Sequence, residues 1–125
     1  MTSEPALVHR WRTLLTSYNV IASHLERALQ EAHGLGLGEF ETLDRLVTTA
    51  SCDKRRMQEL AADMYLSQSA LSRTVARLEK NGLVRRELCQ DDRRGVFVAV
   101  TGDGIQRHAD ARATHRAVLA EHFGS

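Results

Sequence analysis

The chain has 125 residues, of which 42% are hydrophobic and 26% are charged, so we expect one domain with a modest core. It carries no apolar stretch long enough for a signal peptide or a membrane span, and its two cysteines, Cys52 and Cys89, form no CxxC pair. The HExxH, GxSxG, phosphate-loop and dinucleotide-binding motifs are absent from the sequence. We therefore expect a cytoplasmic protein that is not an enzyme and has no membrane partner, cofactor or metal site.

The net charge of the chain is only +1, but it is unevenly distributed along the sequence. Residues 54–94 contain ten Lys or Arg against six Asp or Glu, whereas the rest of the chain contains seven against ten. Because clustered Lys and Arg side chains attract phosphate, this central segment is predicted to contact nucleic acid.

Residues 6–33 are predicted to form a long helix. Pro5 lies at its start, where a missing N–H costs nothing, and Gly34 follows its end. Apolar residues recur along one face, which predicts packing against a partner element. Trp11 and Tyr18 of this face could line an effector pocket, but at helical spacing such aromatic residues are more often part of a core. The whole face comprises Leu7, Trp11, Leu14, Leu15, Tyr18, Ile21, Leu25, Ala28 and Leu29.

A second helix is predicted over residues 38–50, and two short helices follow a loop over residues 51–56. Apolar residues of the short helices recur at helical spacing with a break near residues 65–67, so the two helices share a core and cross at an angle. Tyr65 occupies their turn, where glycine is frequent, so the turn either avoids positive φ or strains the tyrosine. The apolar residues are Leu60, Met64, Leu66, Leu71, Val75 and Leu78.

The second of these short helices has a polar face that is predicted to contact DNA. Its first residue, Ser67, is a good N-cap, because its hydroxyl can accept a hydrogen bond from a free backbone N–H. The side chains that follow on this face have the length and polarity to reach base edges and phosphates. The predicted contacts are Ser67, Gln68, Ser69, Ser72, Arg73 and Arg77.

A β-hairpin is predicted over residues 84–100, after a turn at Asn81-Gly82. Its strands alternate, with Val84, Arg86 and Leu88 on the same face of the first strand and Val96, Val98 and Val100 on the same face of the second. In the tip, Arg93 or Arg94 is expected to enter a narrow minor groove, with Asp92 holding the neighbouring guanidinium. The alternative is a solvated turn without function. Further phosphate contacts are expected at Lys54, Arg55, Lys80 and Arg85.

The last predicted helix covers residues 102–123, and small side chains line one of its faces. Together with the long first helix it presents more apolar surface than one small domain can cover, which indicates a homodimer formed by the first and last helices. The small residues are Ala109, Ala113, Ala117 and Ala120.

Two groups of residues allow sharper interpretations. His108, His115 and His122 share a face of the last helix and could bind an anion, a metal or protons. A solvated or interface face is favoured, because seven-residue spacing separates the side chains by about 10 Å. Cys89 lies among arginines that could make it an oxidation sensor, but a passive thiol is favoured because no second cysteine is near in sequence.

Several linked motifs resemble the MarR family of bacterial winged-helix transcription regulators. They are ELA at 59–61, SxSxxSR at 67–73, RLEKNGLVRR at 77–86, DDRR at 91–94 and VTGDG at 100–104. The resemblance implies a mainly α-helical fold with a small β-wing. It implies one domain over residues 1–125, with a winged helix-turn-helix lobe over residues 38–101 and dimerisation helices over residues 6–33 and 102–123.

The resemblance also implies an effector pocket between the dimerisation helices and the DNA-binding lobe, with small anionic aromatic molecules as frequent ligands. Arg45, Arg112 and Arg116 are the candidate effector-binding residues. We predict a sequence-specific DNA-binding regulator, a ligand-responsive repressor that binds an inverted-repeat operator as a homodimer. One alternative is a winged-helix protein-interaction module without DNA binding, and a more remote one is a metal buffer that uses the histidines.

Overall fold

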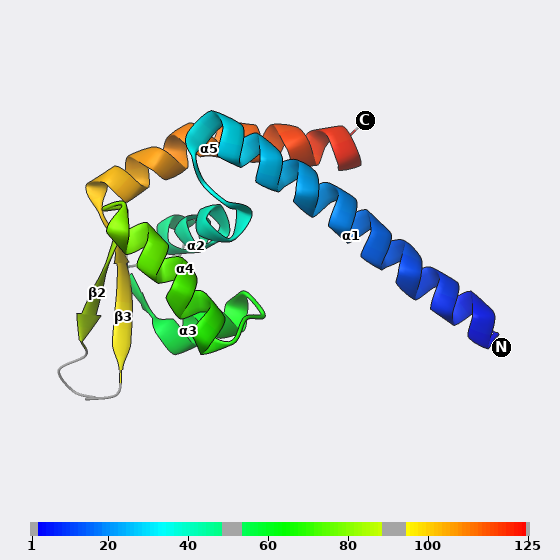
Figure 1. The fold of residues 1–125 in the computed structure, drawn as a ribbon, viewed down its shortest axis with the longest axis horizontal. Coiled ribbons are helices and arrows are strands. Elements are labelled where there is room, and N and C mark those ends of the chain that lie inside the picture. Colours follow the sequence, from blue (N-terminus) through cyan, green and yellow to red (C-terminus); the bar gives the residue numbers. More distant parts are fainter. Residues whose placement is uncertain (1–2, 49–53, 89–94, 125) are drawn as a thin grey trace.

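The structure is a computed structural model that describes residues 3–48, 54–88 and 95–124 (Figure 1). Within these residues the chain forms five helices and three strands. In chain order they are α1 (Glu4–His33), α2 (Leu37–Thr48), β1 (Lys54–Arg56), α3 (Met57–Asp63), α4 (Gln68–Lys80), β2 (Val84–Leu88), β3 (Val96–Val100) and α5 (Gly102–Phe123).

The core surrounds α2, which lies below α1 and α5 in this view and packs against both of them and against α4 (Figure 1). Phe40, Leu43 and Leu46 of α2 are fully buried and pack with apolar residues of the other helices and of the sheet. Leu71 and Leu78 of α4 are also fully buried, as their helical spacing predicted. Burial of this face fixes α4 in the lobe and leaves its opposite face in solvent.

The first half of α1 extends away from the rest of the chain, whereas its second half packs against α5 (Figure 1). Ser3 caps the helix at the backbone N–H of Ala6, and Gly34 ends it in the left-handed conformation. Trp11 and Tyr18 are 59% and 69% exposed, so the prediction that they belong to a core is wrong for the single chain. The apolar face reaches beyond the surface that the chain itself can cover.

The turn between α3 and α4 places Tyr65 at a φ of 58°. Of the two alternatives left open by the sequence, the turn therefore has a positive φ and strains the tyrosine. Its side chain is 95% exposed, so no burial compensates for the left-handed backbone. The turn nevertheless holds, because the N–H of Leu66 donates to the carbonyl of Ala61 at 2.9 Å.

Replacing Tyr65 with glycine is therefore expected to stabilise the fold by about 0.5–1 kcal/mol, since glycine adopts positive φ without strain. Urea unfolding followed by circular dichroism measures this change. Tyr65→Ala is the matched control, because it removes the ring and keeps the strain. An equal gain from alanine would show that the ring, and not the backbone, is unfavourable.

The strands form one antiparallel sheet in the order β1-β3-β2. Residues 54–56 were predicted to be part of a loop, but they form β1, which pairs with β3 in the register Arg55↔Val98. The prediction that Val84, Arg86 and Leu88 form an inward-facing side of β2 is only partly correct. Val84 is buried, whereas Arg86 and Leu88 are exposed, because the outer end of the hairpin projects beyond the core.

His108 and His115 of α5 point inward against α2, so the interpretation of their face as solvated or as an interface is wrong for these two residues. They are 4% and 6% exposed and stack on the ring of Phe40. His122 lies further along α5, where its Nε2 is 3.1 Å from Nδ1 of His24. In the described residues, no three or more His, Cys, Asp or Glu side chains are arranged to hold a metal ion.

Candidate nucleic-acid interface

The exposed face of α4 carries the polar residues that the sequence predicted for it. The hydroxyl of Ser67 accepts a hydrogen bond from the N–H of Ala70 at 3.1 Å, so this serine is the N-cap. Gln68, Ser69 and Arg73 are exposed along the first turns of the helix. A helix with one apolar buried face and one polar exposed face can lie in a groove of DNA without losing its packing.

An open groove of about 690 Å³ lies between α4 and the sheet. Among the described residues that line it are three arginines and no acidic residue. We call it the α4–wing groove; its lining residues are Arg56, Met57, Gln58, Gln68, Ser69, Ser72, Arg73, Arg86, Gly95 and Val96. The concentration of guanidinium groups makes this surface suited to phosphate and to guanine edges.

The sequence missed Arg56, Gln58 and Arg86 as parts of this surface. Arg56 was assigned to a loop, although it ends β1, and Arg86 was placed on the buried face of β2. The SxSxxSR and DDRR motifs predicted DNA contacts only in α4 and in the wing tip. The basic run of residues 54–56 was the signal that could have added Arg56 to Lys54 and Arg55 as a predicted DNA contact.

Arg86 joins the wing to α4. Its Nη2 donates to the carbonyl oxygen of Ser72 at 3.0 Å, and its Nε lies 3.6 Å from Oε1 of Glu79. The other carboxylate oxygen of Glu79 accepts a hydrogen bond from the backbone N–H of Arg86 at 3.3 Å. These contacts fix the angle between β2 and α4, and so the shape of the α4–wing groove.

Three of the four further predicted phosphate contacts form ion pairs within the chain. Lys54 and Arg85 both bind Glu87, at 3.3 Å and 2.9 Å, and their hydrogen bonds hold the pKa of Glu87 below its usual value. The guanidinium of Arg55 lies 2.5 Å from Asp63, and its side chain is only 16% exposed. Lys80, at the end of α4, is exposed. Lys80 is therefore the best placed of the four to meet a phosphate.

Comparison with known proteins agrees with this geometry. The model of the MarR family matches residues 36–96. AbsC, a MarR family transcriptional regulator from Streptomyces coelicolor, is 33% identical, with a TM-score of 0.85 over 98% of this chain and 81% of AbsC. The chain belongs to the MarR family. Both the family and the winged helix-turn-helix fold predicted from the sequence are thereby confirmed.

Two other MarR structures are informative. Sco3205 from Streptomyces coelicolor, solved in complex with DNA, is 31% identical, with a TM-score of 0.88 over 98% of this chain and 76% of its own. CouR from Rhodococcus jostii RHA1, solved bound to p-coumaroyl-CoA, is 28% identical, with a TM-score of 0.77 over 89% and 76% of the two chains. The chain spans 58% and 72% of the lengths of two curated relatives, both HTH-type regulators of Bacillus subtilis.

The predicted wing-tip contacts Asp92, Arg93 and Arg94 lie outside the described residues, as do Cys52 and Cys89. The wing is therefore defined here by β2 and β3, whose ends lead to the tip (Figure 1).

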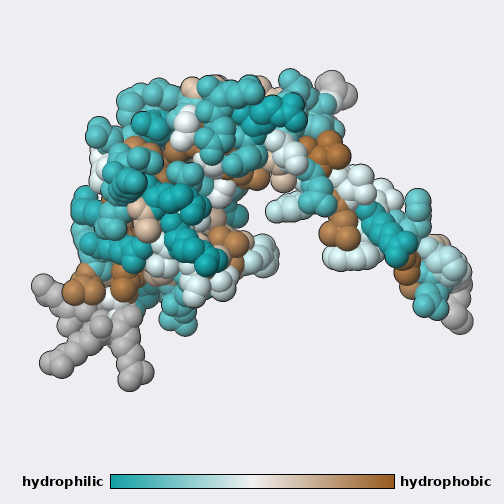
Figure 2. Space-filling model, in the orientation of Figure 1, coloured by the Kyte–Doolittle hydropathy of each residue, from teal (hydrophilic) through white to brown (hydrophobic). Residues whose placement is uncertain are grey.

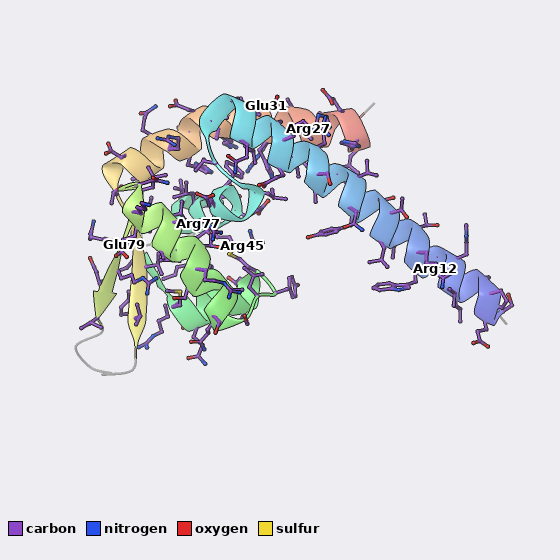
Figure 3. The ribbon with its side chains drawn as sticks, viewed as in Figure 1. Arg12, Arg27, Glu31, Arg45, Arg77 and Glu79 are labelled. Atoms are coloured by element: carbon purple, nitrogen blue, oxygen red, sulfur yellow. The ribbon has the colours of Figure 1, made fainter. Side chains whose placement is uncertain are left out.

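Arg77 is exposed on α4, and its Nη2 donates to the hydroxyl of Thr74 at 3.2 Å (Figure 3).

A second groove, of about 630 Å³, lies between α1, α2 and the turn after α3. Of the three candidate effector-binding residues, Arg45, labelled in Figure 3, lines it, whereas Arg112 and Arg116 are not among its lining residues. We call it the α1–α2 groove; it is lined by Leu14, Ser17, Tyr18, Ile21, Ala22, Leu25, Leu37, Gly38, Glu41, Arg45, Met64, Leu66 and Phe123. The lining is mainly apolar, with one acid and one base. In the described part of the chain, no helix has the length and hydropathy needed to span a bilayer.

Proposed function

We propose that this chain regulates transcription by placing α4 in the major groove of DNA. The observation that supports this most directly is the α4–wing groove, in which Arg56, Arg73 and Arg86 lie beside an exposed polar helix face. Sco3205, which shares the fold over nearly the whole chain, has been solved in complex with DNA. On this proposal the predicted contacts of α4 and its cap meet base edges and phosphates; they are Ser67, Gln68, Ser69, Ser72, Arg73 and Arg77.

We further propose that the DNA-binding form is a homodimer, with α1 and α5 as dimerisation helices and the lobe between them as the DNA-binding part of one domain. The exposed apolar side chains of α1 support this, because a monomer gains nothing from leaving them in water. Figure 2 shows apolar residues along the extended half of α1. The four alanines of α5 are also exposed, which lets another helix approach closely. Two copies of α4 related by a two-fold axis would fit an inverted-repeat operator.

The α1–α2 groove supports ligand-responsive regulation. It joins α1, a proposed dimerisation helix, to the turn that precedes α4, so a bound molecule would affect the spacing of the two recognition helices. CouR, a relative with the same fold, has been solved with p-coumaroyl-CoA bound. We propose repression relieved by a small ligand at this groove.

The test of DNA readout is Arg73→Ala. An operator is first selected from genomic fragments with the purified protein, and affinities for this operator and for random DNA are then measured. We expect Arg73→Ala to weaken operator binding by about 1–3 kcal/mol and random binding much less, because Arg73 would pair with a base edge.

The matched control is Arg27→Ala, which removes an exposed arginine of α1 on another part of the molecule (Figure 3). It should leave both affinities unchanged. Equal losses on operator and random DNA would make Arg73 a phosphate contact. Failure of the unmodified chain to select any fragment would instead favour the alternative, a winged-helix module that binds protein.

A further inference from the structure

His115 forms the centre of a buried polar network between α5 and α2. Its Nε2 lies 3.1 Å from Oε1 of Glu41, and its Nδ1 lies 2.9 Å from Nη1 of Arg116. The imidazole stacks on the ring of Phe40, with 4.5 Å between centroids. Both ring nitrogens thus have a partner, and the ring has little freedom to turn.

The two partners determine where the proton of His115 lies. A guanidinium offers only N–H donors and stays charged, so Nδ1 must accept from Arg116. The proton is therefore on Nε2, which donates to the carboxylate of Glu41. In this arrangement His115 is neutral, and a second proton would set an N–H of the imidazole against an N–H of Arg116.

Glu41 connects this buried network to the α1–α2 groove. While Oε1 faces His115, Oε2 lies 2.6 Å from Nη1 of Arg45, and both Glu41 and Arg45 line the groove. Arg45 and Glu41 thus neutralise each other at the polar end of an otherwise apolar site. An anion that binds Arg45 in the groove competes with Glu41 for this guanidinium and adds negative charge beside that carboxylate.

We propose that binding of an aromatic anion in the α1–α2 groove is coupled to the uptake of one proton by His115. When the anion pairs with Arg45, protonated His115 replaces Arg45 as the cation beside Glu41. The proton comes from solvent, no covalent bond changes, and the charge of the site is conserved. The inference rests on the proposed function in treating this groove as the effector site, and it adds that effector binding senses pH.

The other charged groups around His115 accommodate this step. When Nδ1 becomes protonated, Arg116 can keep its contact with Asp44, whose Oδ1 already lies 3.3 Å from Nη2. Burial raises the pKa of Asp44, but the hydrogen bond from His108 and the charge of Arg116 outweigh it and hold the pKa below its usual value. Asp44 is therefore an ionised acceptor at neutral pH.

The titratable groups of α1 that approach α5 have other partners. His24 faces His122 and Glu121, and Nε2 of His33 lies 2.7 Å from the hydroxyl of Thr114. In the described network, His115 is thus the imidazole that touches Glu41. Histidine is also the side chain whose charge ordinarily changes between about pH 5 and 8.

Isothermal titration of the full chain with benzoate at pH 7.5 and pH 6.0 tests the proposal. Benzoate is ionised at both values, and benzamide has the same shape without the charge. We expect benzoate to bind about fivefold or more tightly at pH 6.0, within the tenfold per pH unit that uptake of one proton permits. Benzamide should bind with the same affinity at both values. Absence of benzoate binding at millimolar concentration, or a pH-independent affinity, would overturn the proposal.

His115→Gln separates proton uptake from structure. The glutamine amide can donate to Glu41 and accept from Arg116 as the neutral imidazole does, but it takes up no proton in this range. We expect this variant to bind benzoate with the same affinity at pH 7.5 and pH 6.0, and so to lose the gain at pH 6.0. Glu41→Gln provides a second route, because Arg45 then loses its competing carboxylate; benzoate should bind more tightly and without pH dependence.

The matched control is His33→Gln, which removes another imidazole between α1 and α5 that does not touch Glu41. It should keep the full pH dependence, and its loss there would assign the proton to a different site. Because these titrations contain no DNA, their outcome does not depend on whether the chain binds DNA. A chain that couples benzoate to a proton but selects no DNA fragment would refute the regulator and not the coupling.

Discussion

Replacing Gly104 with alanine is expected to destabilise the fold by about 3 kcal/mol or more, among the larger losses that one methyl group can cause. A Cβ at this position would lie 2.1 Å from the carbonyl oxygen of Leu83 and 2.7 Å from Cγ2 of Val100. The nearer atom belongs to the backbone and cannot turn aside. The start of α5 would have to move away from the wing.

The loss should be large because Gly104 lies where three elements meet. The N–H of Thr101 donates to the carbonyl of Leu83 at 3.1 Å, and the hydroxyl of Thr101 donates to the carbonyl of Gly82 at 2.7 Å. The same hydroxyl accepts the N–H of Gly104 at 3.1 Å and so caps α5. Moving Gly104 therefore disturbs the end of α4, the start of β2 and the start of α5 together.

Urea unfolding measures this effect, and Gly102→Ala is the matched control. Gly102 begins the same helix, and a Cβ there would meet nothing within 4 Å. We expect Gly102→Ala to change stability by less than about 1 kcal/mol. If the two alanine variants unfold at similar urea concentrations, the close approach at Gly104 is not a structural constraint.

The parts of this fold that local pattern determines were predictable from the sequence. In α4, Leu71, Val75 and Leu78 recur at helical spacing after a serine cap, so both the buried face and the polar face followed from the sequence alone. The exposed arginine of that polar face, Arg73, was placed correctly for the same reason.

The parts that depend on contacts between distant segments were not predictable. β1 has three residues and becomes a strand only because β3, more than forty positions later, offers it an edge. His108 and His115 are buried because Asp44 and Glu41 of α2 supply carboxylates to their Nε2 atoms. Spacing along α5 shows that the histidines share a face but cannot show what that face meets.

The exposed apolar residues in the first half of α1 also depend on a distant contact, in this case a contact with another molecule. Leu7, Trp11, Leu14 and Tyr18 recur at intervals of four, three and four residues, the spacing with which one helix packs along another. In a helix of 30 residues, about 45 Å long, this seam continues beyond the body of the single chain. The natural partner for an identical surface is a second copy related by a two-fold axis.

Replacing Trp11 with glutamate is therefore expected to raise the dissociation constant of the proposed homodimer by about a hundredfold or more. Trp11 is 59% exposed in the single chain, so the change should leave the fold of each copy intact. In the dimer the two-fold axis places the new carboxylate in the interface twice, and a buried tryptophan contributes about 2 kcal/mol or more to such an interface. Sedimentation equilibrium measures the dissociation constant directly.

The same variant should bind an inverted-repeat operator far more weakly, because two recognition helices about 34 Å apart act together only while the dimer holds them. His9→Glu is the matched control: it introduces the same residue at an exposed position of α1, about 160° around the helix from Trp11. It should remain dimeric and keep its operator affinity. A Trp11→Glu protein that stays dimeric, or that becomes monomeric and still occupies the whole operator with unchanged affinity, would contradict the proposal that α1 holds the DNA-binding dimer together.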